Sequence, residues 1–170
     1  FKYFKNYLSL EVFLKKLFLK NKKVLVLGLG KSGIAASELL ISAGAKVVCS
    51  DTKTKNELRK VSSFFENKNI DLKFGLQENS LLEKKDLIIK SPGIPENIPL
   101  LQEAKKRNIK IIGEIELAYL FCQSKIIAIT GTNGKSTTTT LLGEILKKAS
   151  KKVLVGGNLD IPYAELVAKS

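Results

Sequence analysis

Histidine and tryptophan are absent from this 170-residue chain, and cysteine and arginine occur only twice each. Without histidine, the chain cannot form a histidine-based catalytic triad or a histidine-ligated zinc site. The two cysteines, Cys49 and Cys122, are far apart, so we interpret them as small buried apolar residues in a reducing compartment rather than a disulfide framework. No uninterrupted apolar run reaches the ~18 residues that a membrane-spanning helix needs. These absences favour a cytoplasmic protein.

Acidic residues are also scarce, with 16 against 29 lysines and arginines, which gives a net charge of +13. Such a surplus favours an anionic partner, whether nucleic acid, a membrane surface or a phosphorylated small molecule. Base readout depends on the guanidinium fork of arginine, and this chain is basic almost entirely through lysine. The composition therefore favours general phosphate attraction, or compositional drift, over sequence-specific binding to nucleic acid.

Nearly half of the net charge lies in the first 23 residues, where seven lysines stand against Glu11. Apolar residues recur there at three- and four-residue spacing, which predicts a basic amphipathic helical extension over residues 1–22. Contact with an anionic membrane surface is one interpretation of this extension. The alternatives are a helix that docks on the following domain and a segment upstream of the true start. A signal peptide is not indicated, because Glu11 and the Lys15-Lys16 pair interrupt the hydrophobic stretch.

From residue 23 onward, short β-branched runs alternate with helical patterns. Strands are expected at 24–29, 46–50, 71–74, 86–90 and 109–112, and helices at 32–43, 56–67, 100–108 and 114–122. Repeated β-turn-α units predict an α/β fold with a parallel, Rossmann-like sheet. We place this domain at residues 23–123.

A second strand–loop–helix unit is expected to begin at residue 124. It comprises a strand at 126–129, a helix at 135–149, a strand at 153–155 and a trailing helix. So few elements make a poor free-standing core, so we interpret residues 124–170 as the incomplete start of a second domain.

The first glycine loop, Gly28-Leu29-Gly30-Lys31-Ser32-Gly33, lies between a predicted strand and a predicted helix. Its glycines allow a tight turn, close approach of a phosphate and close packing of helix on strand, and the helix N-terminus then faces the anion. Asp51 follows Gly33 by 18 residues, close to where a ribose-binding acid is expected. On its own the loop is compatible with NAD, or with glycines that serve only a tight turn.

The second glycine loop resembles a phosphate cradle between a strand and a helix. Lys135 can reach the β- and γ-phosphates of ATP, and Ser136 can bind Mg²⁺. The strict P-loop pattern is not met, because Ile129 stands where the first glycine is expected. The ATP-binding candidates are Gly131, Thr132, Asn133, Gly134, Lys135, Ser136 and Thr137.

Both loops are used only by a protein that holds one nucleotide-linked substrate and one ATP. A nicotinamide dehydrogenase leaves the second loop without a role, and an ordinary ATPase leaves the first without one.

Several motifs in register resemble the Mur ligases, the cytoplasmic amide-forming enzymes of peptidoglycan synthesis. They are the two glycine loops, Ser91-Pro92-Gly93-Ile94-Pro95, Gly113-Glu114-Ile115-Glu116-Leu117-Ala118 and Gly156-Gly157-Asn158. The Lys135-Ser136 pair and the Ser-Pro-Gly-Ile loop favour the member that adds D-glutamate to UDP-N-acetylmuramoyl-L-alanine. The family commonly reads Gly-Gly-Asn-Ile-Gly at the last motif, where this chain has Leu159 and Asp160.

The resemblance implies that the first domain holds UDP rather than NAD. It implies that the UDP-substrate site consists of Lys31, Ser32, Asp51, Thr52, Lys53, Gly93 and Asn158. It also implies a central ATPase domain in which Lys135 and Ser136 are catalytic, with ATP and Mg²⁺ as cofactors. In the family reaction the substrate carboxylate is phosphorylated by ATP, and the amine of D-glutamate then displaces the phosphate.

The family's later metal-binding residues, its modified lysine and its C-terminal domain have no counterpart in these 170 residues. We therefore expect that the chain alone does not ligate, and that it is a monomer. The alternatives are a sibling Mur ligase with another amino acid, an NAD-dependent oxidoreductase that uses Gly28, Gly30, Gly33 and Asp51, and a non-catalytic nucleotide-binding module.

Overall fold

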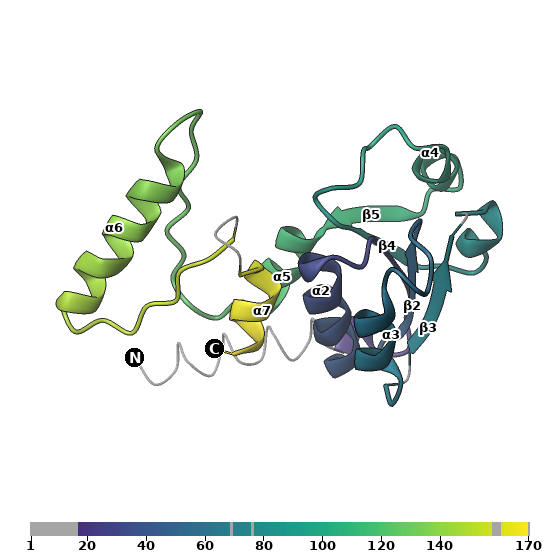
Figure 1. Cartoon of the computed structure of the whole chain (residues 1–170), viewed down its shortest axis with the longest axis horizontal. Helices are drawn as coiled ribbons and strands as arrows, with labels where there is room; N and C mark the ends of the chain where they lie inside the picture. Colours follow the sequence, from purple (N-terminus) through teal and green to yellow (C-terminus); the bar gives the residue numbers. More distant parts are fainter. Residues whose placement is uncertain (1–16, 69, 76, 158–160, 170) are drawn as a thin grey trace.

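A computed structural model describes residues 17–68, 70–75, 77–157 and 161–169 (Figure 1). Its centre is a five-stranded sheet in the order β3-β2-β1-β4-β5, in which every neighbouring pair is parallel. The strands are β1 (Lys23–Leu27), β2 (Lys46–Asp51), β3 (Ile70–Phe74), β4 (Leu87–Lys90) and β5 (Lys110–Gly113). The predicted α/β fold with a parallel, Rossmann-like sheet is confirmed, and each of its five expected strands forms.

The sheet is covered on both faces, as a parallel sheet requires. Helices α2 (Lys31–Ser42), α3 (Arg59–Phe65) and α5 (Glu114–Phe121) cover one face, whereas α4 (Pro99–Lys106) and the 3-10 turn η1 (Asn79–Leu82), which was not predicted, cover the other. Alternate residues of β1 point to opposite layers, with Val24 and Val26 packed on the α2 side and Leu25 and Leu27 on the α4 side. All four are fully buried, which explains why this run is continuously apolar.

The strands expected at 126–129 and 153–155 do not form, and these segments are irregular. Ile126, Ile127 and Leu154 are about half exposed or more. A strand needs a neighbouring strand for its backbone hydrogen bonds, and the described part of the second unit provides none. The two expected helices do form, as α6 (Lys135–Lys148) and α7 (Tyr163–Ala168).

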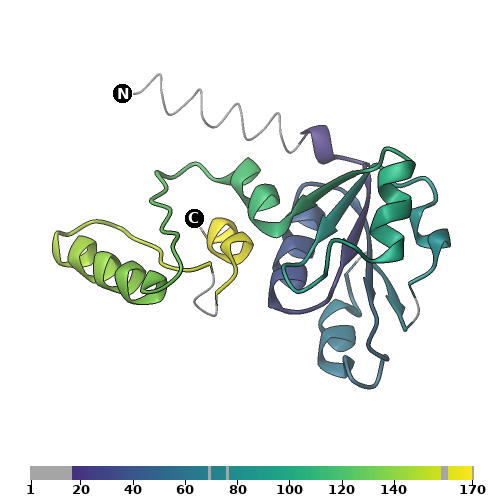
Figure 2. The ribbon, with the colours of Figure 1, turned by 90° about the horizontal axis from the view of Figure 1, so that it is seen from above.

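The second unit is divided between two locations. Helix α6 lies apart from the sheet in both views (Figures 1 and 2). Helix α7, in contrast, packs against α2 and α5 of the first domain, and its Ala164 is fully buried in their core. The domain boundary at residue 124 stays a prediction, but the chain returns to the first domain after it.

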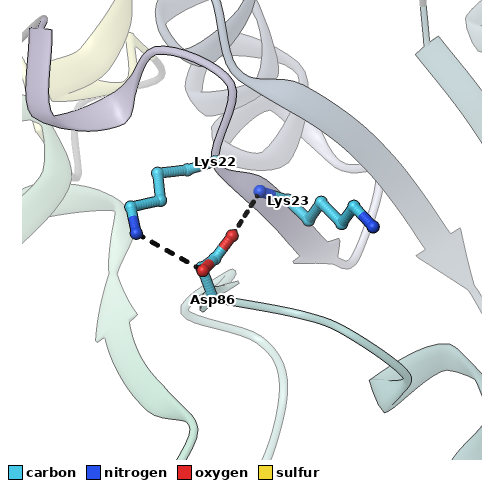
Figure 3. A network of polar contacts seen from close by, with 3 residues as sticks. All are labelled: Lys22, Lys23 and Asp86. Carbon is cyan, nitrogen blue, oxygen red and sulfur yellow. Dashed lines mark hydrogen bonds and ion pairs between the residues drawn. The ribbon is translucent and has the colours of Figure 1, made fainter.

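Asp86, which precedes β4, holds the beginning of β1. Its carboxylate accepts the backbone N–H of Lys23 at 2.8 Å and the Nζ of Lys22 at 3.4 Å (Figure 3). The backbone donor first, and then the Lys22 ammonium, hold the pKa of Asp86 below its ordinary value.

Most of the predicted N-terminal extension, residues 1–16, lies outside the described residues. Of the described end, Leu19 is buried in the core, whereas the Phe18 side chain is 70% exposed. Among the described residues, no helix is long and apolar enough to cross a membrane.

Candidate functional site

Three loops meet at the carboxyl edge of the sheet, where ligands of open α/β sheets bind. The chain adds β2 and β3 on one side of β1 and then β4 and β5 on the other side. The loops that follow the neighbouring strands β1 and β4 therefore lie beside each other. The third loop follows β2, the other neighbour of β1. The loops span residues 28–30, 52–54 and 91–95. All but one of the UDP-site residues predicted above lie in these loops or directly beside them: Lys31 and Ser32 at the start of α2, Asp51 at the end of β2, and Thr52, Lys53 and Gly93 in the loops.

The glycines of the first loop serve two different requirements. Gly28 has φ +87°, in the left-handed region that favours glycine, and its N–H donates to the Ser50 carbonyl at 2.8 Å. Gly33 allows close contact between the helix and the loop, because a Cβ there would lie 1.8 Å from the Gly28 carbonyl oxygen. Helix α2 begins directly after Gly30. The N-terminus of a helix can bind an anion, so this edge offers a place for one.

Asp51 braces the first glycine loop. One carboxylate oxygen accepts the N–H of Leu29 at 2.7 Å, and the other accepts the N–H of Lys53 at 2.9 Å. The sequence predicted Asp51 as a ligand-binding residue, and it did not indicate this contact with the loop. Each carboxylate oxygen accepts more than one hydrogen bond, so the contact is compatible with a ligand at the same side chain.

Asp51→Ala is expected to lower the free energy of unfolding by about 2 kcal/mol, because it leaves two loop N–H groups without their acceptor. Chemical denaturation of the variant and the wild type measures this difference. Asp71→Ala is the matched control, since Asp71 is an exposed acid on the edge strand β3, and the expected change is within about 0.5 kcal/mol. Equal stability of the two variants would contradict the bracing role.

The loop after β4 is held by two residues that the sequence did not single out individually for this role. The buried Ser91 hydroxyl donates to the Gly28 carbonyl at 3.0 Å, which joins this loop to the first glycine loop. The Nζ of Lys90 donates to the Ile94 carbonyl at 3.0 Å and so closes the turn around the exposed Gly93. A lysine as the last residue of an otherwise apolar strand was the available signal, because a half-buried ammonium needs oxygen acceptors.

The second glycine loop turns sharply just before a helix. Gly131 and Gly134 both have positive φ, at +151° and +76°, and α6 begins directly afterwards at Lys135. The Nζ of Lys135 turns back into the loop, where it donates to the carbonyls of Gly131 and, at 3.2 Å, Thr132. Ser136 and Thr137 are exposed. The lysine and the N-terminus of α6 therefore lie at this loop, and such a combination can bind an anion.

The structure does not bring the two glycine loops together, since α6 lies apart from the sheet (Figure 2). Asn158, the remaining predicted substrate residue, lies outside the described residues, as do Leu159 and Asp160. Within the described ranges, no cluster of three or more acidic or cysteine side chains is arranged to hold a metal ion.

The cysteines are both free thiols. Cys49 is buried, and burial raises the pKa of its thiol to about 12, although the Ser37 hydroxyl 3.1 Å away partly opposes this. The Cys49 thiol therefore stays protonated at neutral pH. Cys122 is half-buried.

Glu114, the first residue of α5, is a buried carboxylate at the same edge of the sheet. It accepts the N–H of Ala164 in α7 at 2.5 Å. Burial raises the pKa of Glu114, and the hydrogen bond from Ala164 opposes this only in part.

The raised pKa of Glu114 predicts a pH dependence of stability. The folded protein binds this proton more tightly than the unfolded chain, so the contribution is complete below the ordinary pKa of 4.5 and is lost as pH rises through the raised value. The free energy of unfolding of the wild type, relative to Glu114→Gln, should therefore fall between pH 4 and pH 7. Denaturant titrations of both proteins at both pH values measure it, and a difference that rises with pH would contradict the prediction.

The known proteins that the chain resembles in sequence are named as ligases. The chain is 48% identical over 143 residues to a UDP-N-acetylmuramoylalanine–D-glutamate ligase of Koribacter versatilis, which covers 84% of this chain and 32% of the relative. It is 45% identical over 152 residues to the enzyme of the same name from Thermoanaerobacter pseudethanolicus, which covers 89% of this chain and 34% of the relative. The chain thus spans about a third of the length of the curated relatives it matches.

Solved structures of related ligases share the fold. A pseudomurein peptide ligase type C from Methanothermus fervidus superposes with a TM-score of 0.53 at 30% identity, over 86% of this chain and 31% of that chain. A murein peptide ligase from Psychrobacter arcticus gives the same TM-score at 22% identity, over 76% of this chain and 27% of that chain, and so supports the fold alone.

Residues 22–113 match the family described as "Mur ligase MurD-like, N-terminal domain". This match covers more than half of the chain and contains β1 to β5 with all three loops at the carboxyl edge. The chain therefore belongs to the MurD-like Mur ligase family, and its five-stranded domain is the N-terminal domain of that family.

Proposed function

We propose that this chain provides the UDP-substrate site and part of the ATP site of a ligase that adds D-glutamate to UDP-N-acetylmuramoyl-L-alanine. The observation that supports the proposal is the combination of two glycine loops, each of which is followed directly by a helix. One is braced at the carboxyl edge of the sheet by Asp51 and Ser91, and the other precedes α6 and carries Lys135. The identity to enzymes of that name extends over at least 84% of the chain.

In this proposal, the diphosphate of the sugar nucleotide lies against the N-terminus of α2, where backbone N–H groups and the positive end of the helix dipole favour an anion. Lys31 and Ser32 begin this helix. Thr52 and Lys53 are exposed on the adjoining loop and would contact uracil and ribose. Gly93 presents backbone from the third loop, which Lys90 keeps in its turn. Asn158 would contact the substrate beyond the UDP.

The ATP loop, residues 131–137, would bind the triphosphate. A carboxylate is a poor electrophile until one oxygen becomes part of a phosphate leaving group. In the proposed reaction a carboxylate oxygen of the substrate attacks the γ-phosphorus and ADP leaves. The amine of D-glutamate then adds to the acyl carbon and loses a proton, and phosphate leaves with the C–O bond electrons. Lys135 would neutralise charge on the transferring phosphoryl group. Mg²⁺, when bound at Ser136, would supply further electrostatic stabilisation.

The chain spans only about a third of the length of the matching enzymes. We propose that the chain binds nucleotides without completing the reaction by itself. ATP-dependent phosphate release from this chain that required both UDP-N-acetylmuramoyl-L-alanine and D-glutamate would contradict this statement.

Calorimetry of the chain with two ligands tests the binding function. UDP-N-acetylmuramoyl-L-alanine is expected to bind, and NADH is not, because the proposal assigns the first loop to a UDP diphosphate. Binding of NADH without binding of the UDP compound would overturn the proposal in favour of a dinucleotide-dependent oxidoreductase.

A further inference from the structure

Helix α7 is held on the first domain although it follows the second glycine loop in sequence. It packs against α2 and α5, where Ala164 is fully buried, and Pro162, directly before the helix, is buried as well. The two partners of the hydrogen bond between Glu114 and Ala164 are 50 residues apart. The C-terminal segment is therefore attached to the domain that carries the predicted UDP site.

Glu114 provides the polar part of this attachment. Its side chain is directed at the first turn of α7, where the helix has N–H groups without intrahelical partners. A buried carboxylate is costly unless it is hydrogen-bonded, so an apolar residue would serve simple packing better at this position. The carboxylate selects one placement of α7, because its acceptor has to meet a donor at 2.5 Å.

The location of Glu114 connects the attachment with the substrate site. Residue 114 follows β5 directly. Because all five strands are parallel, it lies at the same carboxyl edge as the loops after β1, β2 and β4. The N-terminus of α7 is therefore brought to the edge where the UDP compound is proposed to bind.

The turn before α7 is packed onto the helix. The N–H of Gly157 donates to the Ile161 carbonyl at 2.8 Å. A Cβ at Gly156 would lie 2.4 Å from Cδ1 of Leu166 and 2.9 Å from the Ile161 carbonyl oxygen, so this backbone approaches the helix closely. The glycine pair is therefore packed against α7, and we treat the two as one unit.

We propose that Glu114 is a positioning residue that fixes α7 and Gly156-Gly157 at the carboxyl edge of the sheet, and thereby supports the substrate contact that the proposed function assigns to the turn after this glycine pair. The inference rests on the proposed function for the identity of the ligand. The hydrogen bond from α7 to Glu114 itself does not depend on that function.

The binding experiment compares two ligands by calorimetry on the full 170-residue chain. Glu114→Ala should weaken the binding of UDP-N-acetylmuramoyl-L-alanine about fivefold or more, and it should leave the affinity for UDP unchanged, because UDP reaches only the first-domain loops. Glu114→Gln keeps an acceptor oxygen and should stay within about twofold of the wild type. Ile115→Ala is the control, since that side chain is 60% exposed on the same helix.

A second variant changes the contact between the glycine pair and α7. Gly156→Ala should disturb the contact with Leu166 and selectively weaken the same ligand. Combined with Glu114→Ala, it should add little further loss, because the two changes release one unit. Unchanged affinity of Glu114→Ala for the full sugar nucleotide would overturn the proposal, and so would an equal loss of affinity for both ligands.

Amide hydrogen exchange tests the attachment without any ligand. The Ala164 amide should exchange about tenfold faster or more in Glu114→Ala than in the wild type, and near the wild-type rate in Glu114→Gln. Equal exchange in Glu114→Ala and the wild type would overturn the positioning role. A wild-type chain that binds neither ligand but shows the expected exchange would contradict the proposed function and leave α7 attached through Glu114.

Discussion

Gly33→Ala is expected to lower the free energy of unfolding by about 3 kcal/mol or more, and to remove binding of the UDP compound. The added methyl would lie 1.8 Å from the Gly28 carbonyl oxygen and 3.0 Å from the Ser91 hydroxyl oxygen. Neither neighbour is a flexible side-chain end, because Gly28 is held by its bond to Ser50 and Ser91 is buried. The helix and the glycine loop would have to separate, which would displace the proposed diphosphate site. Denaturant unfolding and calorimetry with UDP measure the two effects.

Gly30→Ala is the matched control in the same loop. A Cβ at Gly30 would have no atom within 4 Å, and its φ of −72° suits any residue. We expect a loss of stability of about 1 kcal/mol or less, which corresponds to replacing glycine at a helix N-cap. UDP binding should still weaken, since the methyl group would stand where the backbone faces the ligand. Equal destabilisation by the two substitutions would contradict the packing role of Gly33.

Lys135→Ala is expected to weaken ATP binding by about two orders of magnitude while the affinity for UDP stays unchanged. The side chain turns into its own loop, where it donates to the carbonyls of Gly131 and Thr132. Its charge therefore lies in the space where the proposed triphosphate would bind, and hydrogen bonds to charged groups contribute about 1.5–3 kcal/mol each. UDP affinity should be spared because α6 lies apart from the sheet (Figure 2).

Calorimetry with ATP and with UDP measures both affinities of this variant. Lys148→Ala, at the opposite end of α6, removes the same charge from the same helix and should leave both affinities within about twofold. A loss of both affinities in Lys135→Ala would indicate misfolding or one shared site, and it would contradict the two-site interpretation.

The strands of the first domain could be predicted because each is a short apolar run that both faces of the sheet bury. The run around β1 is the clearest example, with Val24 to Leu27 fully buried. The strands expected at 126–129 and 153–155 have the same kind of sequence but do not form. A strand is completed by hydrogen bonds to a neighbour, so its own residues predict only part of it. In the first domain each apolar run pairs with a neighbouring strand, whereas the apolar runs of the second unit have no such neighbour among the described residues.

The glycine loops, the fold class and the family were determined by the sequence alone, because each depends on residue types at fixed local spacing. The contacts of Asp51 with Leu29, of Ser91 with Gly28 and of Glu114 with Ala164 were decided only by the tertiary structure. Each of these bonds joins segments at least 22 residues apart, whose meeting depends on strand order and helix packing. Local spacing predicts which residues can bind a phosphate. Which other residues hold these loops and helices in place depends on how the sheet and its helices pack.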